Sequence, residues 1–194
     1  MTRPIFLRTA VLAAGCLLAG LAQAGDRVQP VLGFGLTGGG ETLLTVPFAD
    51  GSSESISSGG LVHLYAGLRL PVAPQFALQA TIGYHVDDVS ASNGSVRFSR
   101  FPVELLGQFD VAPQIRLNGG VRFATGTKVT TSGVVSSAVP NTSFSASPGL
   151  VLEGEYLFSD NISVALRYVN ETYKAPNGVK IEGSHVGGYV KFMF

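Results

Sequence analysis

Glutamate and arginine residues recur within segments in which polar and apolar side chains alternate. In a β-strand every second side chain shares a face, so Glu104 and Arg122 fall on the polar faces of neighbouring strands, as do Glu153 and Arg167. Carboxylates and guanidinium groups that share a narrow space form ion pairs or line a path for protons and ions. We predict two ion pairs, Glu104 with Arg122 and Glu153 with Arg167. A gated proton or ion path is the alternative.

The register of each pair follows from the short turn between its strands. Centring the first hairpin on Ala112 places the Glu104 side chain diagonally from its arginine, within reach of long side chains. Centring the second hairpin near Asp160 places Glu153 directly opposite its arginine. Further charged residues are expected on the same polar face: Arg69, Arg100, Glu171 and Lys191.

Eight alternating segments must position these side chains, and each is long enough to cross a bilayer as a tilted strand. They are 28–36, 61–70, 76–86, 96–109, 115–125, 147–156, 162–173 and 185–194. Mean hydropathy is positive at +0.32, yet after the first two dozen residues no apolar run approaches the roughly 18 that a membrane helix needs. The sequence therefore predicts an all-β fold, a single closed antiparallel up-and-down transmembrane β-barrel of about eight strands.

The connections between the segments alternate strictly between short and long. The short ones are 71–75, 110–114 and 158–161, and the long, polar ones are 37–60, 87–95, 126–144 and 174–184. Barrels of outer membranes have this asymmetry, with short turns on the periplasmic side and longer loops outside. A ninth or tenth short strand within the longer loops is an alternative that the sequence leaves open.

A soluble β-sandwich is the alternative fold, because alternation alone does not say which face is inside. Aromatic residues near the segment ends favour the membrane barrel, since they suit the two interfaces of a bilayer. The polar face is also rich in arginine and nearly free of lysine, which suits packed ion pairs better than a solvated surface.

The first residues are typical of a cleaved signal peptide. Arg3 and Arg8 precede the apolar stretch 10–21, and Ala22-Gln23-Ala24 forms a cleavage site. We predict a signal peptide over 1–24 and a barrel domain over 25–194. A retained membrane anchor and lipidation at Cys16, which follows a partial lipobox, are the alternatives.

Two parts of the sequence resemble known barrels. Val186, Gly188, Val190, Phe192 and Phe194 alternate toward a terminal phenylalanine. This resembles the C-terminal signature that the barrel-assembly machinery recognises, carried by Val190, Phe192 and Phe194. The stretches 149–168 and 101–106 resemble strands of the OmpA-like/OmpX-like superfamily of small outer-membrane barrels. The resemblance implies a bacterial outer-membrane location and contact with membrane lipids and lipopolysaccharide. It implies function poorly, because the family includes anchors, adhesins, small channels and a few enzymes.

An eight-stranded barrel is only just wide enough for its own side chains. We therefore expect a plugged polar interior and a structural or surface-interaction role through the outer loops, as a monomer. A small channel for ions or hydrophobic solutes is the alternative, and a lipid-modifying enzyme comes third. His63 and His85 are expected side by side and inward, but with Asp87 they match no metal-ligand spacing. We expect no cofactor, no metal, no catalytic residues and, given balanced charge, no nucleic acid. The sequence does not identify a host or surface ligand.

Overall fold

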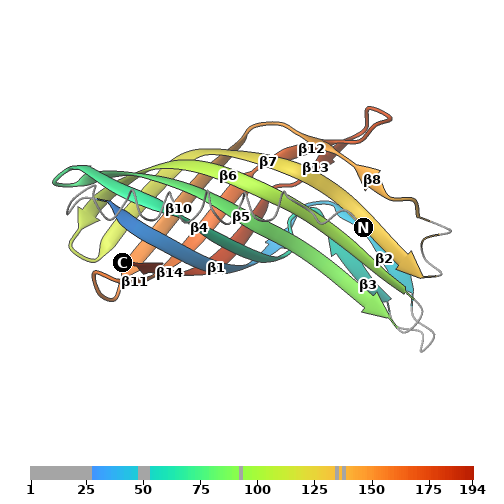
Figure 1. The fold of residues 1–194 in the computed structure, drawn as a ribbon, viewed down its shortest axis with the longest axis horizontal. Coiled ribbons are helices and arrows are strands. Elements are labelled where there is room, and N and C mark those ends of the chain that lie inside the picture. The colour runs from blue at the N-terminus through green and yellow to red at the C-terminus, as the bar shows by residue number, and fades with distance from the viewer. Residues whose placement is uncertain (1–27, 48–52, 92–93, 134–135, 137–138) are drawn as a thin grey trace, which may run out of the picture.

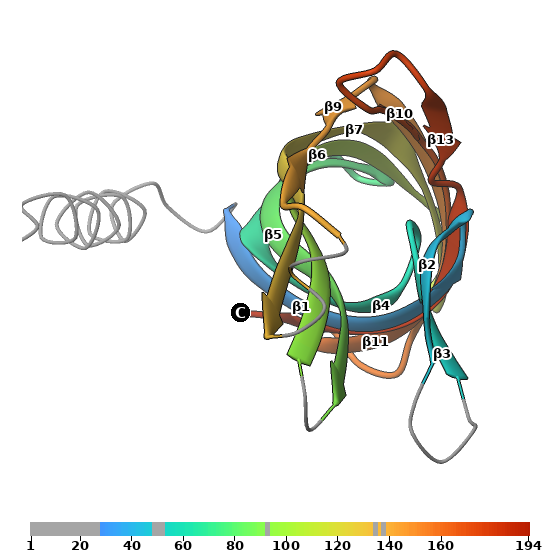
Figure 2. The same ribbon diagram turned by 90° about the vertical axis from the view of Figure 1, so that its right-hand side faces the viewer.

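Eight antiparallel strands form a closed ring in the computed structural model, which describes residues 28–47, 53–91, 94–133, 136 and 139–194. Each strand pairs with the next, and the last pairs with the first (Figure 2). The predicted barrel is thus confirmed, whereas 1–24 lie outside the described residues. Within the described ranges no helix is long and apolar enough to cross a membrane. The strands are β1 (Gln29–Gly39), β4 (Leu61–Ala73), β5 (Phe76–Ala91), β6 (Gly94–Ala112), β7 (Ile115–Gly133), β10 (Gly149–Leu157), β11 (Ile162–Asn170) and β14 (His185–Met193).

The two ends of the barrel differ. At one end, here called the turn end, only two residues join β4 to β5 and β6 to β7. At the other, the loop end, β5, β6 and β7 continue beyond their neighbours for total lengths of 16, 19 and 19 residues (Figure 1). Additional short strands lie at this end, in or next to the segments expected to be loops, and the expected strand 162–173 is divided after Asn170. The short strands are β2 (Thr42–Pro47), β3 (Ser53–Ser57), β8 (Thr142–Ser143), β9 (Ser145–Ala146), β12 (Thr172–Lys174) and β13 (Lys180–Glu182).

The strand faces are reversed relative to a water-soluble protein. On β11 the outward-facing Leu166 is 71% exposed, and the adjacent Arg167, which points into the barrel, is 1% exposed. The same alternation runs through β10 and β14. Because the sheet closes on itself with its apolar face outside, the alternative of a soluble sandwich is excluded.

Two glycines of β1 make room for aromatic rings inside the barrel. A Cβ atom on Gly33 would lie 2.0 Å from the ring of Tyr65, and one on Gly35 would lie 2.2 Å from the ring of Tyr189. Both tyrosines are buried. At these two positions the inward face of β1 is therefore flat, and rings from the strands on either side lie across it.

The structure corrects one of the two predicted registers. Glu104 lies directly opposite Arg122, not diagonally. The tight turn lies between Ala112 and Ile115, and a register shift follows Asp110, so the hairpin is not centred on Ala112. In the other hairpin, Glu153 lies opposite Arg167, as predicted.

Candidate functional site

The charged residues singled out in the sequence meet inside the barrel. Arg122 Nη1 lies 3.0 Å from Glu104 Oε1, and Arg167 Nε lies 2.7 Å from Glu153 Oε2. All four side chains are at most 1% exposed. Arg167 also donates to Glu104, at 2.9 Å, so the two pairs are joined into one network.

This network is part of a longer series of ion pairs, here called the charge chain. Carboxylates and cations alternate along it, with successive N–O distances of 2.5–3.8 Å. Every carboxylate buried in the chain thus contacts two cations. From the turn end to the loop end its members are Asp110, Arg116, Glu155, Lys191, Glu153, Arg167, Glu104, Arg122, Glu171 and Arg100.

Several members match the sequence expectations and others were missed. The charge chain includes Arg100, Glu171 and Lys191, as expected. Arg69 lies beside the charge chain, 3.9 Å from Asp110. The link between Arg116 and Glu155, at 3.5 Å, was not anticipated because these residues stand on strands whose mutual register no short turn sets.

Aromatic side chains occupy the lumen beside the charge chain. The Arg167 guanidinium lies 4.4 Å from the ring centroid of Tyr189 and 5.2 Å from that of Tyr65. Guanidinium groups stack favourably on aromatic faces, most strongly where water is excluded. The tyrosines therefore pack against the same arginine that two glutamates hold.

Three histidine rings contact one another near the tyrosines. His63 and His85 are paired across β4 and β5 and face inward, as predicted, with His185 against His85. Nδ1 of His85 lies 2.9 Å from the Arg122 guanidinium, and Nε2 lies 2.8 Å from the Thr37 hydroxyl and 3.1 Å from the Arg100 guanidinium. The Asp87 carboxylate instead accepts from the Ser57 backbone N–H. In the part of the chain that the structure describes, no three potential ligands gather as a metal ion requires.

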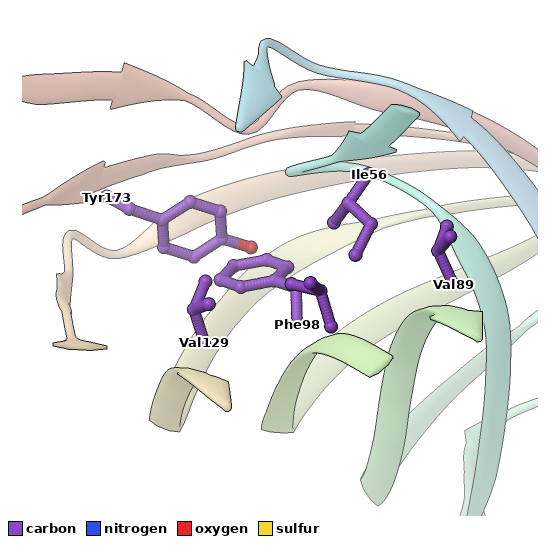
Figure 3. Close-up of a cluster of buried hydrophobic side chains, with 6 residues drawn as sticks. Ile56, Val89, Phe98, Val129 and Tyr173 are labelled. Carbon is purple, nitrogen blue, oxygen red and sulfur yellow. The ribbon is translucent and has the colours of Figure 1, made fainter. Parts of the chain in front are cut away.

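An apolar cluster, here called the apolar cap, covers the charge chain at the loop end. Its side chains come from β3, β5, β6, β7 and β12 and are at most 8% exposed (Figure 3). The Tyr173 hydroxyl donates to Glu171 at 2.5 Å, and the Arg100 guanidinium lies 4.9 Å from the ring centroid of Phe98. The cap is thus anchored to the charge chain. Its members are Ile56, Val89, Val96, Phe98, Val129 and Tyr173.

A cavity of about 200 Å³ lies within the cap region. Leu43 and Leu44, on β2, contribute to its wall. The cap itself was missed, because the stretches 87–90 and 126–133 each hold a single apolar side chain, Val89 and Val129, and do not continue the alternation. The lining consists of Leu43, Leu44, Ile56, Val96, Val129, Val139, Thr142, Phe144 and Ile181.

The residues of the C-terminal signature lie on the outward face. Val190, Phe192 and Phe194 are 36%, 40% and 65% exposed. The Phe194 backbone N–H donates to the carbonyl of Pro30, so the terminal residue lies at the seam where β14 meets β1.

Comparisons with known proteins agree with this architecture. Among solved structures, the attachment invasion locus protein Ail of Yersinia pestis, in complex with the heparin analogue sucrose octasulfate, superposes with a TM-score of 0.51 at 11% identity. The match covers 87% of this chain and 98% of Ail. Neisserial surface protein A superposes with a TM-score of 0.50 at 12% identity. The match covers 86% of this chain and 96% of the chain of Neisserial surface protein A. These likenesses show the fold.

No curated protein matches the sequence. The model of the outer membrane protein beta-barrel domain family does match it, over residues 9–192. The chain therefore belongs to the outer-membrane β-barrel protein family and is a protein of the bacterial outer membrane.

Proposed function

We propose that this protein is a closed, non-conducting barrel that acts at the cell surface through its loop end. The charge chain carries the proposal. Its ten side chains contact one another across the lumen, and nine of them are at most 8% exposed. Opening a water path would separate buried ion pairs, and stranding one buried charge costs roughly 3–5 kcal/mol. The lumen pairs Glu104–Arg122 and Glu153–Arg167 thus act as structural plugs.

The orientation of the barrel follows from its two ends. Short turns lie on the periplasmic side of outer-membrane barrels and longer segments lie outside. We place the loop end outside the cell, where its short strands form a raised surface over the buried apolar cap. The Ail structure holds a heparin analogue, and a role in surface attachment is consistent with the proposal.

The remaining assignments concern export and assembly. We propose that residues 1–24 direct export and are removed, which leaves 25–194 as the barrel. Val190, Phe192 and Phe194 present the outward apolar face that the assembly machinery would recognise, and the barrel would then stand as a monomer among lipids and lipopolysaccharide. We assign it no enzymatic activity.

The test is conductance in a planar bilayer, using protein shown to be folded by its heat-dependent gel shift. The wild-type barrel is expected to give no discrete steps. A Glu104→Ala/Arg122→Ala variant, which removes two adjacent members of the charge chain, serves as the matched comparison, and a known porin controls for insertion. Reproducible steps from the folded wild-type protein would overturn the closed-lumen proposal and favour a small channel.

The cavity in the apolar cap favours a second function, the binding of a small hydrophobic solute. Its volume of about 200 Å³ exceeds that of the roughly 150 Å³ apolar cavity that holds benzene in an engineered protein. Saturable binding of benzene or a short alkane to the folded protein, lost in Val129→Phe, would support it. Equal binding by both proteins would remove this second function.

A further inference from the structure

Three of the four lysines in the chain lie on one outward face at the loop end. Lys128 is on β7, Lys174 on β12 and Lys180 on β13, and all three are exposed. The fourth, Lys191, is buried in the charge chain. The concentration of exposed lysine on one surface, in a barrel that otherwise uses arginine, calls for a specific physical reason.

Strand pairing shows that the three lysines share one face. Lys128 is opposite Ser143, and Lys174 is opposite both Ser145 and Lys180. Ser143 on β8 and Ser145 on β9 are both exposed on either side of the half-buried Phe144, so they connect the lysines across a continuous surface. We call these five residues the lysine face.

The residues between them point the other way. Val129 and Tyr173 belong to the apolar cap, and Phe144 and Ile181 line its cavity. Because the cap is buried, it fixes the lysine face on the outer surface of the wall. The lysines consequently point sideways from the barrel and not along its axis into the medium.

The lysine face is electrostatically unfavourable by itself. Lys174 and Lys180 stand directly opposite each other, and like charges in that position destabilise a sheet. Among the described residues none of the three lysines forms a salt bridge. The nearby Glu182 carboxylate accepts from the backbone and the hydroxyl of Ser184. An anionic ligand would remove the repulsion.

The height of the lysine face relative to the apolar band indicates which anions it meets. The outward apolar band of β7 ends at Phe123, and that of β11 ends at Tyr168. Lys128 and Lys174 follow five and six residues later, which on a tilted strand is roughly 12–15 Å beyond the band. A lysine side chain can extend back toward the band, so its ammonium group reaches the headgroup layer.

We infer that the lysine face binds the phosphate groups of lipopolysaccharide molecules that lie beside the barrel wall. Ammonium groups are strong phosphate ligands, and the two serine hydroxyls supply further donors. The sideways orientation favours a neighbouring lipid over a soluble partner. The inference rests on the outward placement of the loop end and does not depend on a closed lumen.

Binding of purified lipopolysaccharide to the folded protein in detergent tests this inference. The probes are intact lipopolysaccharide, the same material after chemical dephosphorylation, and heparin. The proteins are the wild type, the triple variant Lys128→Gln/Lys174→Gln/Lys180→Gln, and Arg97→Gln, whose exposed guanidinium already has Asp88 as a partner. The heat-dependent gel shift verifies that each protein is folded.

The triple variant is expected to bind intact lipopolysaccharide about tenfold or more weakly than the wild type, because each basic residue near an anionic surface adds to affinity. Dephosphorylation should weaken wild-type binding to the same degree, and Arg97→Gln should bind nearly normally. Unchanged binding by the triple variant would overturn the inference. Loss of heparin binding alone would also overturn it and assign the face to sulfated glycans. Conductance is measured separately, so neither outcome bears on the closed lumen.

Discussion

Glu104 and Arg122 face each other directly across β6 and β7, with 3.0 Å between their nearest nitrogen and oxygen atoms. Neither is bound only to the other. Glu104 also accepts from Arg167, and Arg122 also donates to Glu171 at 3.1 Å. This pair therefore joins the part of the charge chain near the turn end to the part near the loop end.

The energetic coupling of this pair can be measured by a double-mutant cycle. Glu104→Gln and Arg122→Gln should each lower the free energy of unfolding by about 3 kcal/mol, because each leaves a buried charge with one partner fewer. The double variant should lose clearly less than the sum of the two losses. Urea unfolding in detergent, followed by far-ultraviolet circular dichroism, measures all four proteins. Strictly additive losses would contradict a direct ion pair.

A comparison of buried and exposed ion pairs tests the role of burial. Glu153→Gln removes the partner of Arg167 and Lys191 from the barrel interior and should cost about 3 kcal/mol. Asp88→Asn removes a carboxylate whose exposed contact with Arg97 raises the pKa of that arginine, and should change stability by less than about 1 kcal/mol. Equal heat stability of the two variants in detergent would show that the interior pairing is unimportant.

The aromatic rings that lie against the glycines of β1 predict that a larger side chain at these positions is destabilising. Gly33→Ala places a methyl group against the Tyr65 ring, which must move, and should destabilise the barrel by about 1–3 kcal/mol. Gly154→Ala is the matched control, because no atom lies within 4 Å of its added methyl group. Midpoints of urea unfolding compare the two variants. A Gly33→Ala barrel as stable as Gly154→Ala would mean that the ring repacks freely.

The apolar cap should protect the loop end from local unfolding. Phe98→Ala removes a fully buried ring that packs against Phe144 and Tyr173, whereas Phe101→Ala removes an outward ring that is 45% exposed. Hydrogen exchange is expected to accelerate in β8, β9, β12 and β13 of Phe98→Ala, with the strands of the ring unchanged. The Phe101→Ala protein should exchange as the wild type does. Uniform acceleration in Phe98→Ala would indicate that the cap stabilises the whole barrel.

The barrel strands were predictable because alternation is a local property. Leu166 and Arg167 are adjacent in sequence and lie on opposite sides of the wall, and the same rule holds along most of the ring. The register of Glu153 with Arg167 was also predictable from its short turn. The Glu104 register was not, because a register shift lies between Asp110 and Ala112, next to the turn, and alternation does not reveal such a shift.

The parts that were not predicted depend on contacts between distant segments. The apolar cap brings Ile56 together with Tyr173, and the lysine face brings Lys128 near Lys180. The lysine face arises because residues 142–146 pair with β7 on one edge and with β12 on the other, and Ile56 reaches the cap from β3, which among the described strands pairs only with β2. No short turn relates these segments, so alternation could indicate their faces but not their neighbours.

The composition of β1 bears on how the cylinder is sealed. The β1–β14 junction joins the first strand of the ring to the last, so it can form only after both of these strands are in place. From Gln29 to Gly39, β1 carries no ionisable side chain, and the members of the charge chain come from other parts of the barrel, including Lys191 on the adjacent β14. Strand β1 can therefore pair with β14 without carrying a charge of its own through the hydrocarbon and without separating an ion pair that already exists. A smooth closing strand lets the polar interior be completed first and then shut away from lipid.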